Sequence, residues 1–277
     1  MYEKMMGLQC TPRESDATYY DQLTTVIKKL LDEYSLDPDS VKYLFFSHTA
    51  DYVEPQGFNM LQKIATDFKF KNALSFGSTI NKCASGFHFI QLANDLFRTL
   101  NNDDVILLLI ADMAFTKILQ HIPGSTVLGD AATAIVLKKS GENNRLADVL
   151  LEVQDKFSRG LWGDKDEQLL FQSLYIKNLS ALIEDIVHRN NLHLSQIKCI
   201  FPHNVNTISW KQVAHELSLL PEQIYLENIA KTAHCFGSDP FFNLKDGIAE
   251  RRIVPGDYYL LVTMGLGATF GVMLFQY

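Results

Sequence analysis

The chain has 277 residues, of which 47% are hydrophobic and 21% are charged. This balance is typical of a packed globular protein and excludes intrinsic disorder. The net charge of -7 argues against a nucleic-acid partner, because the summed field repels phosphate. The four cysteines form no CxxC pair and the first ten residues contain no signal peptide. We therefore expect no metal site and a cytoplasmic protein.

The first elements along the chain alternate between helix and strand. An apolar stripe from Tyr20 to Leu31 predicts a helix, and a short turn and a buried strand follow at residues 36–45. Further predicted elements are a helix at 59–68, a strand near 73–76, a helix beginning at about Cys83, and core strands at 105–111 and 132–137. This alternation predicts an α/β fold in which helices cover both faces of each sheet.

The second half of the chain repeats the first. Residues 36–45, LDPDSVKYLF, align with residues 192–201, LHLSQIKCIF, and the apolar stripe of the preceding helix recurs from Ile176 to Val187. A polar stretch at 138–145 separates the two copies. We therefore predict two pseudo-symmetric halves, residues 1–140 and residues 141–277.

The last 20 residues, Tyr258 to Tyr277, carry no charge and are long enough to cross a bilayer. Three glycines interrupt this run, and β-branched and aromatic residues flank them. The pattern therefore predicts two buried strands joined by a glycine-rich turn, and no membrane span.

Cys83 is the first candidate for a chemical role. It lies in the small-residue segment STINKCASGF, at the start of a predicted helix. The unpaired N–H groups of a helix N-terminus stabilise a thiolate, and small neighbours leave room for an acyl group. On this local context alone, a nucleophile and a buried structural cysteine are equally good interpretations.

Two polar loops follow in the second half. His203, in the segment PHNVN that also contains Asn206, comes directly after the second repeated strand, where α/β proteins place their sites. His234 precedes Asp239, which aligns with Cys83 in the repeat, so we expect His234 near Cys83. Asp239 either orients His234 or caps a helix. The turn at residues 264–268, MGLGA, suits an oxyanion hole or a plain hairpin equally well.

Five motifs in order carry a resemblance to a known family. They are NKCASGF around Cys83, GDAA at 129–132, PHNVN at 202–206, RIVPG at 252–256 and the glycine turn at 265–271. With these motifs the chain resembles the β-ketoacyl-acyl-carrier-protein synthase III group of the thiolase superfamily. The resemblance implies a five-layered αβαβα fold with two pseudo-symmetric halves, usually as a homodimer.

The resemblance also assigns roles to residues. It implies that Cys83 is the nucleophile, that His203 is the family's histidine, and that the backbone N–H groups of Cys83 and Leu266 form the oxyanion hole. The family's asparagine position falls on His234, with Asp239 and Asn206 in supporting places. The family's opening strand is not found before Gly7, so the chain is truncated, has a smaller first sheet, or receives this strand from another polypeptide.

The function that the resemblance implies is acyl transfer. An acyl group passes from a thioester of coenzyme A or of an acyl carrier protein to Cys83, and then to an acceptor, in fatty-acid, polyketide or other specialised-metabolite biosynthesis. No bound cofactor is implied. Two alternatives remain open: a decarboxylative condensing enzyme in which His234 replaces the asparagine, and a non-catalytic subunit of a ketosynthase-like heterodimer.

Overall fold

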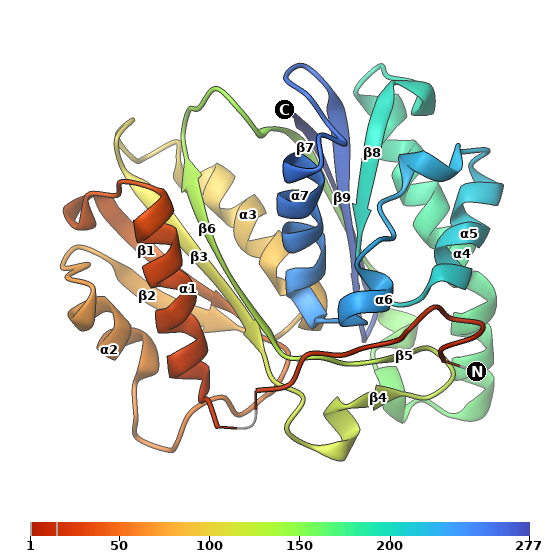
Figure 1. The fold of residues 1–277 in the computed structure, drawn as a ribbon, viewed down its shortest axis with the longest axis horizontal. Coiled ribbons are helices and arrows are strands. Elements are labelled where there is room, and N and C mark those ends of the chain that lie inside the picture. Colours follow the sequence, from red (N-terminus) through yellow and green to blue (C-terminus); the bar gives the residue numbers. More distant parts are fainter. Residues whose placement is uncertain (1, 15) are drawn as a thin grey trace.

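The computed structural model describes residues 2–14 and 16–277. Two four-stranded sheets stand side by side, with one pair of helices between them and one pair on each outer side (Figure 1). The layers follow in the order α1 and α2, first sheet, α3 and α7, second sheet, α4 and α5. This arrangement confirms the predicted thiolase-like α/β fold.

The first sheet has the strand order β2-β1-β3-β6. β1 runs parallel to β2 and to β3, whereas β6 runs antiparallel to β3. Its strands are β1 (Val41–Ser47), β2 (Leu74–Ser78), β3 (Val105–Asp112) and β6 (Ala131–Lys138). All four lie where the sequence predicts strands, and every residue of β3 is buried, as expected for a strand covered on both faces.

The second sheet has the strand order β7-β10-β9-β8. Its strands are β7 (Arg145–Val153), β8 (Ile197–Pro202), β9 (Tyr258–Gly265) and β10 (Thr269–Gln276). The antiparallel pair β9 and β10 confirms the two strands predicted at the end of the chain. β7 was not predicted. It pairs with β10 at the sheet edge, and its half-exposed residues give it a weak apolar pattern.

The internal repeat is visible in the strand pairing. β1 pairs in parallel with β3, and β8 pairs in parallel with β9. Both pairs carry an irregularity at the start of the first strand, between Val41 and Tyr43 in one half and between Ile197 and Cys199 in the other. These positions are equivalent in the sequence repeat, so the two halves share even this local detail.

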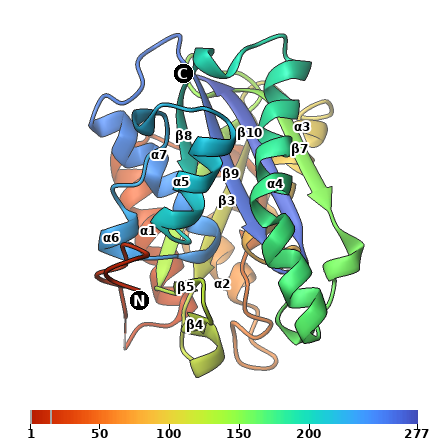
Figure 2. The ribbon, with the colours of Figure 1, turned by 90° about the vertical axis from the view of Figure 1, so that its right-hand side faces the viewer.

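The longer helices bury one face each against a sheet, and α6 is a single short turn. They are α1 (Tyr19–Glu33), α2 (Met60–Asp67), α3 (Ser85–Leu96), α4 (Lys165–Arg189), α5 (Thr207–Glu216), α6 (Ile229–Thr232) and α7 (Asp239–Ala249). α1 begins at a capping box formed by Thr18 and Asp21, which satisfies N–H groups that the first turn leaves free. Separate apolar clusters fill the first outer layer, the middle and the second outer layer, where α4 and α5 cover the sheet (Figure 2).

The N-terminal segment packs on both halves, with Met6 to Cys10 on the second half and Thr11 to Glu14 on the first. Met6 and Leu8 are buried in the apolar cluster beneath α4 and α5, and the N–H of Thr207 donates to the carbonyl of Met6. The strands of the two sheets separate at the predicted polar stretch, but the domain boundary at residue 140 stays a prediction. Among the described residues, no helix is long and apolar enough to cross a membrane.

Candidate active site

Cys83 lies at the point where the two halves meet. It occupies a 3-10 turn (Lys82–Ala84) that runs directly into α3. Its side chain is 7% exposed and lines a cavity of about 810 Å³. The preceding residue, Lys82, has a left-handed φ of 49°, a conformation that costs energy for a residue with a side chain. The turn therefore presents the thiol to an enclosed space that is large enough for a substrate.

Two glycines allow the second half to contact this turn through its backbone. A Cβ at Gly265, the last residue of β9, would lie 1.9 Å from the carbonyl oxygen of Asn81. A Cβ at Gly237 would lie 3.0 Å from the carbonyl oxygen of Cys83. No real side chain fits at the first distance, so this close approach requires glycine at position 265.

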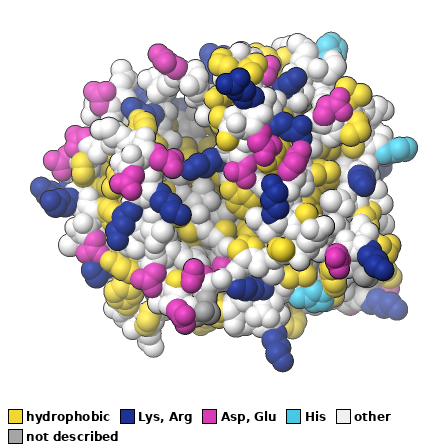
Figure 3. Space-filling view, in the orientation of Figure 1, with side chains coloured by type: hydrophobic (Ala, Val, Ile, Leu, Met, Phe, Trp, Pro, Cys, Tyr) yellow, Lys and Arg dark blue, Asp and Glu magenta, His cyan; other side chains and the backbone are white. Residues whose placement is uncertain are grey.

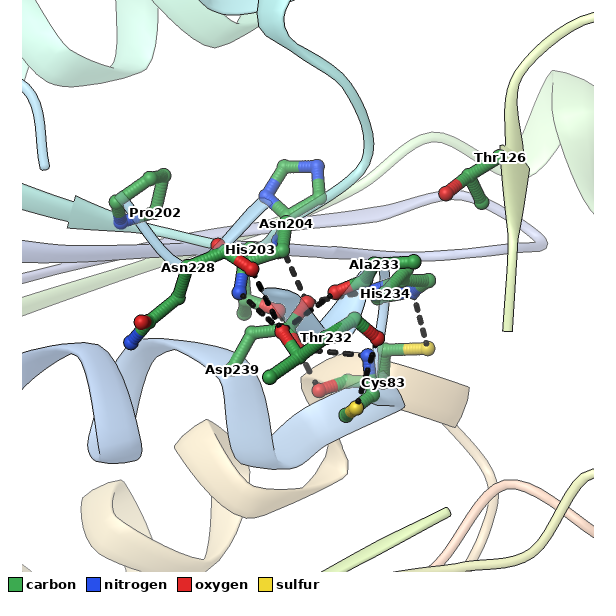
Figure 4. Close-up of polar contacts among 12 residues, drawn as sticks. Cys83, Thr126, Pro202, His203, Asn204, Asn228, Thr232, Ala233, His234 and Asp239 are labelled. Carbon is green, nitrogen blue, oxygen red and sulfur yellow. Dashed lines mark hydrogen bonds and ion pairs between the residues drawn. The ribbon is translucent and has the colours of Figure 1, made fainter. Parts of the chain in front are cut away.

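His234 connects Cys83 to Asp239. Its Nε2 lies 3.6 Å from the sulfur of Cys83, and its Nδ1 lies 2.5 Å from Oδ2 of Asp239 (Figure 4). Burial alone would lower the pKa of His234, but the Asp239 carboxylate and Cys83 outweigh it and raise this pKa to about 10. The three side chains form a nucleophile, a base and a carboxylate in hydrogen-bonded order.

Of these three side chains, Asp239 is the one held in place by backbone N–H groups. It is fully buried, and its Oδ2 also accepts the backbone N–H of Asn204 at 2.5 Å. Its Oδ1 accepts the backbone N–H of Cys235 at 2.7 Å. Asp239 is the first residue of α7 but does not cap it. Of the two interpretations left open by the sequence, the structure supports the orientation of His234.

The backbone of His234 is held by the first half of the chain. Its N–H donates to the carbonyl of Val127 at 3.1 Å, and its carbonyl accepts the N–H of Gly129 at 2.9 Å. Val127 belongs to β5 (Thr126–Val127), the second strand of a small hairpin with β4 (His121–Ile122). His234 is therefore positioned by both halves, its backbone by one and its ring by the other.

His203 lies nearby but has a different environment. It is fully buried, and its ring centroid lies 6.1 Å from that of His234. Its Nε2 lies 2.8 Å from the hydroxyl of Tyr175, while its Nδ1 has no partner among the described residues. Burial and the charge of His234 lower the pKa of His203 to about 3, so the ring is neutral. Tyr175 lines the cavity, whereas His203 is absent from the described residues that do so.

Comparison with known proteins shows a similarity to one family of synthases. Residues 187–277 match the family 3-Oxoacyl-[acyl-carrier-protein (ACP)] synthase III C terminal. A β-ketoacyl-[acyl-carrier-protein] synthase III from Wolbachia sp. subsp. Brugia malayi is 25% identical over 234 residues, which are 76% of this chain and 70% of the relative. The chain is therefore similar to β-ketoacyl-acyl-carrier-protein synthases III, in its C-terminal third by the family match and over most of its length by this relative.

Solved structures with a synthase III-like fold superpose on nearly the whole chain. The acyltransferase ChlB3 superposes with a TM-score of 0.86 and 17% identity, covering 99% of this chain and 88% of its own. The 3-oxoacyl-[acyl-carrier-protein] synthase III of Aquifex aeolicus superposes with a TM-score of 0.80 and 16% identity, covering 100% and 90%. At these identities the likeness establishes the fold.

The remaining predicted site residues of this synthase III-like chain also lie at the cavity. Asn206 lines it and caps α5, because its side chain accepts the N–H of Ser209 at 2.8 Å. Leu266 lines it from the turn between β9 and β10, and its part in an oxyanion hole stays a prediction. Cys235, the residue after His234, is a second buried thiol close to the site; it donates to the carbonyl of Thr232, and burial raises its pKa well above the ordinary value.

The mouth of the cavity is apolar and carries little charge. Ile118 and Trp162 are 52% and 79% exposed there, and among the described lining residues Lys117 is the single Lys or Arg and Glu167 the single Asp or Glu. Acidic and basic side chains are mixed over the face shown in Figure 3. Within the described residues, no group of three or more His, Cys, Asp or Glu side chains is placed to hold a metal ion.

Three residues at the site were missed by the sequence analysis. They are Tyr175 on α4, Asn204 beside Asp239, and Thr49, whose Oγ1 lies 3.8 Å from the Cys83 sulfur. Each depends on a contact between segments far apart in the chain. No local motif marks Tyr175 or Thr49, and the motif PHNVN contains Asn204 without indicating its backbone contact with Asp239.

Proposed function

We propose that the protein is an acyltransferase in which Cys83 is the nucleophile, His234 the base and Asp239 the residue that orients this base. The observation that carries the proposal is the position of His234, with one ring nitrogen 3.6 Å from the sulfur and the other 2.5 Å from the carboxylate. A neutral thiol is a weak nucleophile, and a base held in this way activates it.

In the first step His234 holds the proton of the Cys83 thiol on Nε2, which its raised pKa favours. The thiolate attacks the carbonyl carbon of a thioester, and backbone N–H groups at Cys83 and Leu266 hold the oxyanion. Each such donor contributes roughly 3–4 kcal/mol to transition-state stabilisation. Collapse of the tetrahedral intermediate expels the donor thiolate, which takes the proton from His234. The product is an acyl-Cys83 thioester.

In the second step His234 takes a proton from the acceptor. Acylation removes Cys83 as one of the groups that raise the pKa of His234, so the imidazole is deprotonated more easily than in the free enzyme. The acceptor oxygen or nitrogen then attacks the acyl carbonyl. The Cys83 thiolate leaves and receives the proton that His234 took, which restores the starting state.

The environment of His203 favours transfer to a hydroxyl or amine over decarboxylative condensation. Condensation creates negative charge on the carbonyl oxygen of a carboxylated acceptor and needs donors aimed at it. His203 directs no nitrogen into the cavity, because Tyr175 lies at its Nε2 and its unpartnered Nδ1 belongs to a fully buried ring that is not among the described lining residues. His234 is already paired with Cys83 and Asp239. The likeness to ChlB3, an acyltransferase by its printed name, also supports transfer.

Further parts of the proposal concern the partners. We propose a thioester of coenzyme A or of an acyl carrier protein as the donor, since the cavity reaches Cys83 from the surface. This cavity also argues against a non-catalytic subunit.

We propose a homodimer through the edge strand β2, supported by its exposed Leu74 and Phe76 and by Ile80 beside it, which is 81% exposed. We further propose a reducing, cytoplasmic location, which keeps Cys83 a free thiol.

The test is the mass of the intact protein after incubation with a panel of acyl thioesters. We expect the wild type to gain one acyl group and Cys83→Ala to gain none. Cys10→Ala is the matched control, because Cys10 is the exposed thiol and its loss leaves loading unchanged. Absence of an adduct on the wild type, or an equal adduct on Cys83→Ala, would refute the covalent step.

A pair of histidine variants separates the two mechanisms. We expect His234→Gln to slow acyl-Cys83 formation by roughly 10²- to 10⁴-fold, the usual range for loss of a general base, and His203→Gln to slow it far less. Release of carbon dioxide from a malonyl thioester, measured in parallel, detects condensation. Rapid release by the wild type that depends on His203 would favour the condensing enzyme.

A further inference from the structure

The loop after β1 supplies Cys83 with a second polar neighbour. The hydroxyl of Thr49 lies 3.8 Å from the Cys83 sulfur, close to the 3.6 Å that separates this sulfur from Nε2 of His234. Both distances lie within the range of hydrogen bonds to sulfur, which are longer than those to oxygen because the sulfur atom is larger. The contact with His234 belongs to the proposed base, whereas the contact with Thr49 has no part in the mechanism proposed above.

The backbone of Thr49 is fixed on both sides. Its N–H donates to Oδ1 of Asp112 at 2.7 Å, and Asp112 also accepts the N–H of Ala50 at 3.4 Å. Its carbonyl accepts the hydroxyl of Thr79 at 2.9 Å and the ammonium of Lys82 at 3.5 Å. Because Lys82 directly precedes Cys83, the loop and the nucleophile turn are tied to each other.

Asp112 explains why this loop is held so firmly. It ends β3, is 2% exposed, and directs its carboxyl at two backbone N–H groups of the loop. A buried carboxyl group is stable only when such donors satisfy it. Its side chain thus fixes the Thr49 backbone and also lies within hydrogen-bonding reach of the Thr49 hydroxyl. The hydroxyl proton can therefore point to the Asp112 carboxyl or, by rotation about the C–O bond, to the Cys83 sulfur.

The sulfur needs a donor at the moment when it becomes negative. Once His234 holds the thiol proton, Cys83 carries a negative charge at a position that is 7% exposed, so water solvates it poorly. The imidazolium N–H of His234 supplies one donor. A hydroxyl in reach of the sulfur supplies another, and hydrogen bonds to charged groups are about twice as strong as those between neutral groups.

We propose that Thr49 is a further catalytic residue, whose hydroxyl donates a hydrogen bond to the Cys83 thiolate before the thiolate attacks the thioester. The inference rests on the proposed role of Cys83 as nucleophile. In the acyl-enzyme the sulfur is uncharged, so the contact matters most for the first step and for expulsion of the thiolate in the second.

The test is the pH dependence of Cys83 alkylation by iodoacetamide, followed by intact mass in a Cys10→Ala background. Thr49→Val keeps the shape of the side chain and replaces the hydroxyl by a methyl group. We expect it to slow alkylation at pH 7 by roughly 10-fold and to move the midpoint of the profile up by about one pH unit. Above both midpoints its rate matches that of the parent protein. Thr49→Ser restores the parent profile.

Two controls make the outcome decisive. Thr24→Val makes the same change at a buried threonine of α1, whose hydroxyl bonds to Asp21, and should leave the profile unchanged. A Thr49→Val profile that superimposes on the parent overturns the inference but leaves the proposed function intact. A uniform loss of rate at every pH, without rescue by Thr49→Ser, also overturns it, because this pattern indicates a structural role. Failure of the wild type to form an acyl adduct instead refutes the proposed function.

Discussion

The hydroxyl of Tyr175 lies 2.8 Å from Nε2 of His203, and this pair lies beside the Cys83–His234 pair without joining it. The Tyr175 ring packs between Phe171 and Phe270, whose ring centroids lie 5.9 Å and 6.1 Å from its own. Burial raises the pKa of Tyr175, so its hydroxyl keeps its proton. Tyr175, a residue on α4, therefore holds His203 in place and separates it from the cavity.

Removal of the Tyr175 hydroxyl should destabilise the fold through His203. Tyr175→Phe leaves both ring nitrogens of a fully buried imidazole without a partner, which we expect to lower the free energy of unfolding by about 1–3 kcal/mol. Adding His203→Leu removes the orphaned group, so the double variant should lose less than the sum of the single variants. Urea unfolding of all four proteins measures this coupling. Strict additivity would show that the two side chains do not interact.

The fold could be predicted because its signals are local. The apolar stripes of α1 and α4 and the strands after them carry the repeat in their own residues, and the repeat places Asp239 opposite Cys83. Cys83 and Asp239 lie at the starts of the two central helices, α3 and α7. The repeat therefore predicts that His234, close to Asp239 in sequence, lies near Cys83. β7 was not predicted, because its half-exposed residues have no strong apolar pattern. Tyr175 and Thr49 were not identified from the sequence, because their contacts form only when segments far apart in the chain pack together.

Asp239→Asn should disable His234 while keeping the fold. Three donors converge on this carboxylate: Nδ1 of His234 and the N–H groups of Asn204 and Cys235. A carboxamide carries no negative charge and has one acceptor oxygen in place of two, so it no longer stabilises the imidazolium that His234 becomes when it holds the thiol proton. We expect acyl-Cys83 formation to fall by roughly 10²- to 10⁴-fold, measured by intact mass over time.

The matched control for this change is Asp246→Asn, also on α7, whose carboxylate accepts Asn228 instead. It should load at nearly the rate of the wild type. If Asp239→Asn loads as fast as this control, Asp239 does not orient the base.

Gly265→Ala should disrupt the site through the backbone. The added Cβ would lie 1.9 Å from the carbonyl oxygen of Asn81, so the β9 end and the Cys83 turn must move apart. Forced overpacking of this kind costs about 1–3 kcal/mol or more. We expect a lower melting temperature together with slower loading of Cys83. Gly141→Ala is the control, since its nearest atom lies 3.9 Å away and the residue is exposed. A Gly265→Ala protein that matches this control would contradict the close approach.

The stability of the wild type should depend on pH through Asp112. Burial raises the pKa of this carboxyl to about 7, whereas the unfolded chain has its ordinary value near 3.8. Between these values the folded state holds a proton that the unfolded state releases, so the stabilisation is complete below pH 3.8 and is lost as the pH rises through 7. The loss amounts to about 4 kcal/mol, from roughly three pH units at about 1.4 kcal/mol each.

Asp112→Asn isolates this effect, because the amide oxygen still accepts the N–H groups of Thr49 and Ala50 but does not titrate. Urea unfolding of both proteins at several values between pH 4.5 and pH 8 gives the difference in their free energies of unfolding. We expect the wild type to lose stability relative to the variant as the pH rises. Other groups, including His203, titrate in both proteins and cancel in the difference. A difference that stays constant across this range would mean that Asp112 is charged throughout and held by its donors alone.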